Sequence, residues 1–196
     1  MKNTLILPVL FGLTACAFND PAPVITYYLL DPHPAESNMT LDHTRVQVSS
    51  VRLPDYLKQP NLVMREDTNE LRMANYHSWA DNLSDAIQRV VINDANQLNS
   101  AYSFVSRCDA CPSVTISIEH FYPTRSGQVV LAGTFEIVAA EGQSNATLVR
   151  QFSFSHPIEK EGYDNAVEQM RLLLSQLSVE IVNQLSIPLT PTTPQN

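Results

Sequence analysis

The chain has 196 residues, of which 44 % are hydrophobic and 16 % are charged, and its formal net charge is −8. A domain of this length can bury a sizeable core. Because the surface is negative and repels phosphate groups, we expect no nucleic acid among the partners and no membrane docking through a basic patch.

Residues 1–15 are predicted to be a signal peptide that is removed. Lys2 is followed by an apolar run that ends at Leu13, and small residues come directly before Cys16. This segment is too short and wrongly flanked to span a bilayer permanently. No later run is long and apolar enough to predict a transmembrane helix.

Cys16 is the predicted site of lipid attachment. Leu13 lies three positions before it and Ala15 directly before it, a pattern that resembles the bacterial lipobox, in which the thiol receives a diacylglycerol. The alternative is an ordinary signal peptide that is cut after another small residue. A single acyl chain binds a membrane only marginally, but bacterial lipoproteins usually carry three. We therefore expect a permanent anchor, and this covalent lipid is the only added group that we expect, with no separate cofactor.

Residues 16–24 are predicted to be a lipidated linker, because Pro21 and Pro23 break any regular structure. Eight extended residues reach at most about 26 Å, so the domain is expected to sit close to its membrane. A single domain is expected at residues 25–186. The last segment, residues 187–196, is rich in proline and threonine and is predicted to be disordered.

The first part of the domain is predicted to form short strands. The β-branched and aromatic residues and the turn signals place them at residues 25–30 and 45–53, with a hairpin at residues 62–64 and 70–74. The apolar positions of the second strand change phase between Val48 and Val51, so we expect a β-bulge at Ser49 and Ser50.

Two long amphipathic helices are predicted. The first is expected from Trp79 to Asn99, with Ser78 as its N-cap and Asp81 in its first turn, because apolar residues recur at helical spacing. The second is expected at residues 163–184 for the same reason.

Between these helices lie a short strand at residues 102–105 and three longer strands at residues 114–121, 129–139 and 147–155. Short turns join the three longer strands, which predicts an antiparallel meander. The expected fold is a two-layer α+β domain, in which a mostly antiparallel sheet carries both helices side by side on one face.

Few residues suggest catalysis. Only four glycines follow the predicted cleavage site, and no two are close enough for a phosphate-binding loop. The five histidines do not fall at metal-ligand spacing. Residues 142–146 half resemble a hydrolase nucleophile elbow, but they join two predicted strands and lack the final glycine. We therefore expect a protein that is not an enzyme and binds no metal.

Cys108 and Cys111 form the one motif for which a chemical role is an alternative to a structural role. Redox-active pairs usually open a helix, whereas Pro112 and a predicted strand follow here. No second cysteine pair is present to complete a zinc site. In an exported protein the pair is expected to form a structural disulfide, and a thiol or metal function is the alternative.

Four short motifs resemble the ABC-type transport auxiliary lipoprotein family over roughly residues 25–185. They are Tyr28–Leu30, Leu53–Leu57, Tyr76–Leu83 and Gly162–Ala166. Asn82 stands where the family pattern has a proline, and the Cys108 and Cys111 pair is an addition to it.

This resemblance implies a non-catalytic periplasmic subunit of a lipid transport system. Such a lipoprotein sits at the outer membrane and docks the end of a tubular MCE-domain protein from an inner-membrane complex, and a homo-oligomeric ring is possible. Ala17 after the lipidated cysteine, in place of Asp, agrees with the outer membrane. Exposed residues of the turns at residues 53–57 and 124–127 are candidates for the contact face, and the alternative is that they are ordinary loop surface. The alternative is a structural or assembly lipoprotein of the envelope.

Overall fold

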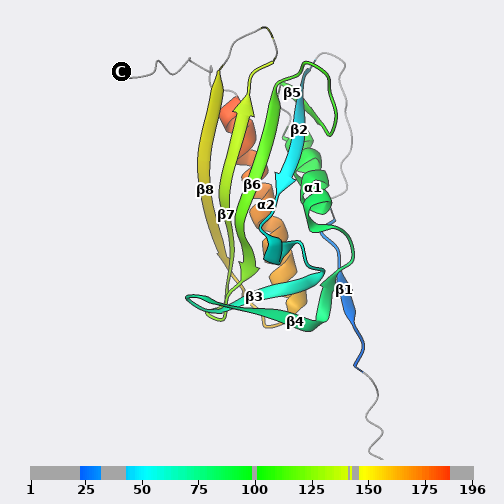
Figure 1. The fold of residues 1–196 in the computed structure, drawn as a ribbon, viewed down its shortest axis with the longest axis vertical. Helices are drawn as coiled ribbons and strands as arrows, with labels where there is room; N and C mark the ends of the chain where they lie inside the picture. The colour runs from blue at the N-terminus through cyan, green and yellow to red at the C-terminus, as the bar shows by residue number, and fades with distance from the viewer. Residues whose placement is uncertain (1–22, 32–42, 99–100, 141, 143–145, 186–196) are drawn as a thin grey trace, which may run out of the picture.

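The structure is a computed structural model that describes residues 23–31, 43–98, 101–140, 142 and 146–185. The predicted signal peptide, Cys16, most of the linker and residues 187–196 lie outside the described residues. The described residues form two sheets and two α-helices (Figure 1). The predicted α+β fold class is therefore confirmed.

The larger sheet has five strands in the order β5-β2-β6-β7-β8. Their bounds are β2 Thr44–Arg52, β5 Tyr102–Val105, β6 Ser113–Pro123, β7 Gln128–Val138 and β8 Thr147–Pro157. The strands β6, β7 and β8 pair antiparallel in sequence order, as the predicted meander requires. The strand β2 runs parallel to both β5 and β6.

The predicted bulge in β2 is present. The register between β2 and β6 shifts between Val48 and Ser50. The hydroxyl of Ser49 at this point donates a hydrogen bond to the carbonyl oxygen of Val114, over 3.1 Å. The bulge lets Val48 stay in the core while the apolar positions beyond it change phase.

A smaller sheet contains β1 (Thr26–Tyr28), β3 (Asn61–Asp67) and β4 (Glu70–Trp79) in the order β1-β4-β3. The predicted hairpin is thus β3 and β4, and it runs across one end of the larger sheet (Figure 1). A single β-bridge, between Arg65 and Thr124, joins the hairpin to the turn after β6. The sheet that we expected to be continuous is therefore divided in two.

Both helices cover the same face of the larger sheet and lie side by side (Figure 1). The helix α1 spans Leu83–Gln97 and α2 spans Tyr163–Leu185. Their apolar stripes form the core with the inward side chains of β2, β6 and β7. Among the described residues, no helix has the length and apolarity needed to cross a bilayer.

The predicted start of the first helix is wrong. Trp79 is the last residue of β4, where its ring stacks on Phe121, and Ser78 is a buried strand residue. The N-cap is Asn82, whose side-chain oxygen accepts hydrogen bonds from the backbone N–H groups of Ser84 (3.0 Å) and Asp85 (3.4 Å). Because Trp79 precedes Leu83 by four residues, its apolar side chain matched the helical period although its backbone is extended.

Candidate functional site

The chain reaches the predicted lipid anchor through β1. Cys16 lies outside the described residues, and β1 begins three residues after Pro23, where the described part starts. The strand pairs parallel to β4, with Thr26 opposite His77 and Tyr28 opposite Trp79. The described chain therefore begins at one end of the domain, beside β1 at the lower right of Figure 1.

The inner face of β1 is held by an aromatic cluster. The Tyr28 hydroxyl lies 2.8 Å from Nδ1 of His77, and the His77 ring stacks on Tyr163 with ring centroids 3.8 Å apart. Tyr163 is the first residue of α2. Burial raises the pKa of Tyr28, and the nearby carboxylate of Asp164 raises it further. The cluster therefore joins β1, β4 and the start of α2.

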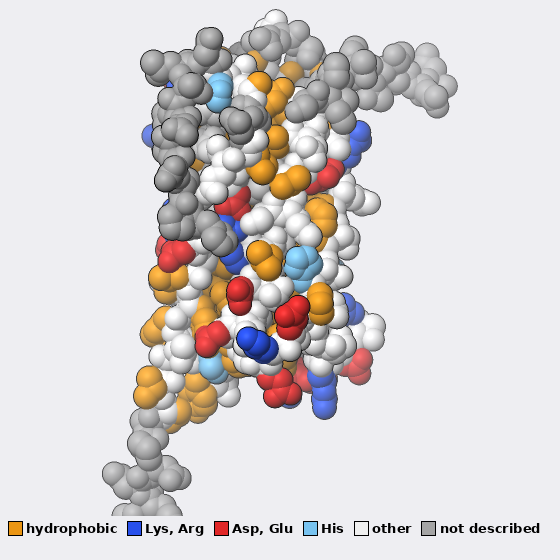
Figure 2. Space-filling view, turned by 180° about the vertical axis from the view of Figure 1, so that it is seen from behind, with side chains coloured by type: hydrophobic (Ala, Val, Ile, Leu, Met, Phe, Trp, Pro, Cys, Tyr) orange, Lys and Arg blue, Asp and Glu red, His pale blue; other side chains and the backbone are white. Residues whose placement is uncertain are grey.

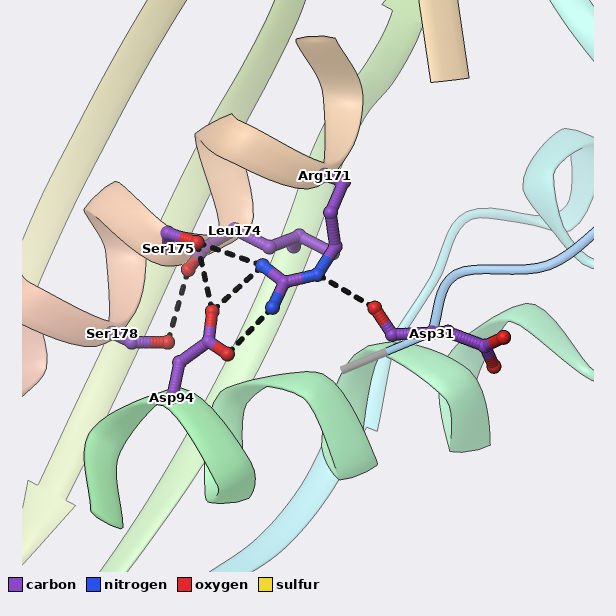
Figure 3. Close-up of polar contacts among 6 residues, drawn as sticks. All are labelled: Asp31, Asp94, Arg171, Leu174, Ser175 and Ser178. Atoms are coloured by element: carbon purple, nitrogen blue, oxygen red, sulfur yellow. Dashed lines mark hydrogen bonds and ion pairs between the residues drawn. The ribbon is translucent and has the colours of Figure 1, made fainter. Parts of the chain in front are cut away.

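A buried ion pair fixes the chain just after β1 (Figure 3). The guanidinium of Arg171 on α2 donates two hydrogen bonds to the carboxylate of Asp94 on α1, over 2.6 and 2.7 Å. The Nε of Arg171 donates to the backbone carbonyl oxygen of Asp31 (2.9 Å). The hydroxyl of Ser175 accepts from Arg171 (2.7 Å) and donates to Asp94 (2.8 Å). We call these four residues the Arg171 clamp.

The clamp joins α1, α2 and the segment that follows β1. All the polar atoms in these contacts have partners, so this cluster is built to position elements. Sequence reasoning missed it, although a signal was present. Asp94 and Arg171 each interrupt the apolar stripe of a helix, and a charge at such a position needs a partner of opposite sign.

The two turns expected to form the contact face lie differently in the structure. In the first, Leu57 is buried and the Tyr56 hydroxyl donates to the carbonyl oxygen of Glu119 (2.5 Å), whereas Asp55 is exposed. In the second, Arg125 and Ser126 are exposed. Both turns therefore carry exposed residues, and a role of either turn in contact with a partner stays a prediction.

A groove of about 410 Å³ separates this second turn from the start of α2. Apolar atoms dominate its lining, which comes from β3, the β6–β7 turn, the loop between β8 and α2, and the start of α2. The residues that line it are Met64, Pro123, Thr124, Arg125, Gly127, Ile158, Glu161, Gly162, Tyr163 and Ala166. On the other side of the hairpin, a hollow of about 230 Å³ lies against Tyr56, His120 and Tyr122.

Tyr56 makes the stability of this end depend on pH. Burial raises its pKa to about 12, with Tyr122 and Glu119 contributing, whereas an unfolded tyrosine titrates near pH 10. The folded state therefore favours the neutral phenol. The contribution of Tyr56 to the free energy of unfolding should be independent of pH below about pH 10 and should fall as the pH rises towards 12.

Denaturant unfolding at a series of alkaline pH values measures this effect. The variant Tyr56→Phe should lose stability less steeply over the same interval, because it has no phenol to ionise at this position. Tyr27→Phe, at an exposed position, serves as the control and should follow the wild type. Equal pH profiles for the wild type and Tyr56→Phe would contradict the assignment.

Cys108 and Cys111 lie in the loop between β5 and β6, at the end of the domain away from β1 (Figure 1). Their Cα atoms are 5.8 Å apart and their sulfur atoms are within bonding distance. The carbonyl oxygen of Pro112 accepts a hydrogen bond from the backbone of Gln47, which ties the loop to β2. A strand follows the pair, so no helix N-terminus is present to lower a thiol pKa.

The other sequence candidates for chemistry do not come together. His77 stacks on Tyr163, and Nε2 of His156 lies 2.9 Å from the amide of Gln176. Within the described part of the chain, no group of three or more His, Cys, Asp and Glu side chains is placed to hold a metal ion. Residues 143–145 of the apparent nucleophile elbow lie outside the described residues, and the segment joins β7 to β8.

The fold resembles two solved structures. One is an uncharacterized protein with a TM-score of 0.73 and 21 % identity, and the match covers 83 % of this chain and 99 % of that one. The other is the protein XCC0632 from Xanthomonas campestris, of the family DUF330, with a TM-score of 0.55 and 18 % identity over 81 % of this chain and 91 % of that one. These likenesses show the fold alone.

The chain has no significant match among curated proteins. A family model does match it, from residue 27 to residue 182, and this range contains every described strand and helix except the ends of β1 and α2. The model describes the ABC-type transport auxiliary lipoprotein component. The matched range includes Tyr27 and Tyr28 of β1, the aromatic cluster and all four residues of the Arg171 clamp. The chain therefore belongs to the ABC-type transport auxiliary lipoprotein family.

Proposed function

We propose that this protein is a lipid-anchored periplasmic subunit of an MCE-type intermembrane lipid transport system. In this proposal Cys16 carries the lipid, and the domain docks the tubular MCE protein at the outer membrane and supports envelope integrity. The match to the family of transport auxiliary lipoproteins carries the proposal, because it implies a transporter partner. A ring of several copies around the tube is part of the same proposal.

The position of β1 supports a role close to the membrane. Val24 lies eight positions after Cys16, so the link can extend over at most about 26 Å. The aromatic cluster and the Arg171 clamp hold the end of this link against the helices. A domain held in this way acts by contact with a partner that reaches the membrane. Ala17 in place of Asp supports the outer membrane as the site of anchoring.

Isolation of the full-length protein from membranes in mild detergent tests the partner. We expect an MCE-domain protein to co-purify, and we expect deletion of the gene to sensitise the envelope to detergents and organic amines. Normal permeability together with no bound MCE protein would contradict the proposal. Cross-linking in intact cells to peptidoglycan or to an outer-membrane barrel would instead favour a structural or assembly lipoprotein.

The cysteine pair provides a second check on the non-catalytic part of the proposal. Cys108 and Cys111 are proposed to form a structural disulfide that closes their loop. The double variant Cys108→Ser and Cys111→Ser should keep the MCE partner and normal permeability, because no redox step depends on the thiols. Loss of function with an intact fold would favour the thiol alternative.

A further inference from the structure

The outer face of β1 and its flanks carries a group of exposed apolar side chains. The exposed fractions are 83 % for Val24, 46 % for Ile25, 63 % for Tyr27, 55 % for Leu29 and 46 % for Tyr76 on β4. We call these five residues the β1 surface. Figure 2 shows hydrophobic side chains gathered at the lower left, next to the point where the chain leaves the described part.

The exposure of these residues follows from the register of the strands. Side chains alternate between the two faces of a strand, so Tyr27 points away from the face on which Tyr28 meets His77. Thr26 lies opposite His77, and the same register continued by one residue places Ile25 opposite Tyr76. Ile25, Tyr27, Leu29 and Tyr76 therefore share one face of two paired strands, whose other face is fixed to α2. Val24 belongs to the β1 surface as the exposed residue of the flank before the strand.

This surface is also free of charge. No Asp, Glu, Lys or Arg occurs from Pro21 to Leu30 or from Met73 to Ala80, in a chain whose net charge is −8. If this surface faced only water, charged residues would be expected in both segments. Tyrosine and aliphatic side chains without charge are typical of the boundary between lipid and water, where tyrosine buries its ring and keeps its hydroxyl wet.

The position of the surface indicates what covers it. Val24, the first of the five residues, is eight positions after the predicted lipid attachment at Cys16. A link of that length keeps the surface within about 26 Å of the lipid. With a lipid on Cys16, the bilayer lies within reach of this surface whether or not a transporter is bound.

We propose that the β1 surface lies in the lipid–water interface of the membrane to which Cys16 is anchored, so that the domain is held at two points in a fixed orientation. This inference rests on the lipid anchor of the proposed function. The contact is apolar, so it should form on zwitterionic lipid and should resist salt. Attraction of basic residues to anionic lipid would behave in the opposite way.

Fluorescence of the full lipidated chain in vesicles tests the contact. The vesicles contain phosphatidylethanolamine and phosphatidylcholine, and in one set the phosphatidylcholine carries brominated acyl chains, which quench tryptophan. The test variant is Tyr27→Trp. The matched control is Val149→Trp on β8, where the wild-type residue is 56 % exposed. The single native tryptophan, Trp79, is buried and gives the same background in both.

We expect the added emission of Tyr27→Trp to shift to the blue and to lose most of its intensity in brominated vesicles. The emission of Val149→Trp should change in neither respect. The quenching should persist at about 1 M salt, where the screening length is only about 3 Å. Thermal unfolding followed by circular dichroism checks that both variants keep the fold.

The outcomes separate the inference from the anchor on which it rests. If the chain floats with the vesicles and Tyr27→Trp is not quenched, the anchor holds and the inference is overturned. A blue shift without quenching, in a chain that forms oligomers, would assign the surface to a second copy and would also overturn it. If the chain carries no lipid and does not float, both the anchor and the inference fail.

Discussion

Replacement of Arg171 by methionine should lower the free energy of unfolding by about 3–5 kcal/mol. The side chains of Arg171 and Asp94 are only 8 % and 10 % exposed, and removal of the cation leaves a buried carboxylate without its counter-charge. The variant also loses the hydrogen bond to the carbonyl oxygen of Asp31. Equilibrium unfolding in urea of the full chain measures the change.

Arg125→Met is the matched control for this prediction. Arg125 also faces a carboxylate, because its Nη1 atom lies 3.6 Å from Oε2 of Glu66, but the Arg125 side chain is 76 % exposed. Its loss should cost less than about 1 kcal/mol. The double variant Asp94→Leu and Arg171→Met should recover most of the stability lost in the single variant, because it leaves no unpaired charge. Equal losses for Arg171→Met and Arg125→Met would show that the buried clamp contributes no more to stability than an exposed ion pair.

Replacement of Cys16 by alanine should release the protein from the membrane. Each buried CH₂ contributes about 0.8 kcal/mol, so the loss of the acyl chains removes far more binding energy than the β1 surface can replace. Cells that carry Cys16→Ala and a clickable fatty acid should show no label on this protein. Their sensitivity to detergents should match that of a deletion strain.

The double variant Cys108→Ser and Cys111→Ser is the control for the lipid label. It removes the other two cysteines of the chain, and it should keep both the label and the membrane fraction. If Cys16→Ala is labelled as strongly as the wild type, the lipid is attached elsewhere, and if neither protein is labelled, the chain carries no lipid. The proposed anchoring would then be wrong.

Local patterns predicted much of the fold. The alternation in β6 and the turns on either side of β7 fixed the meander, and the apolar stripe of α2 fixed the last helix almost to its ends. The phase shift at Ser49 located the bulge in β2. These features depend on the period of the side chains and on short turns, both of which are visible within a few residues.

Features that depend on distant contacts were not predicted. The division into two sheets requires the β3–β4 hairpin to turn across the end of β6, and no local pattern encodes that turn. Trp79 satisfied the helical period, but tertiary packing on Phe121 placed it in a strand. The pairing of Asp94 with Arg171 joins residues 77 positions apart, so each charge was visible in the sequence and its partner was not.

The geometry of β1 determines how this domain bears tension from its tether. The strand runs towards the linker along its own axis and is bonded side by side to β4. A pull along the strand from the proposed lipid anchor would therefore shear all the β1–β4 hydrogen bonds at once, whereas a pull across the strand would open them singly. Arg171 holds the carbonyl of Asp31 behind the strand, so a displaced β1 must also break a buried contact. Under such a load, resistance to detachment of β1 would be a matter of unfolding rate, and the fold would slow this process at the end that faces the proposed anchor.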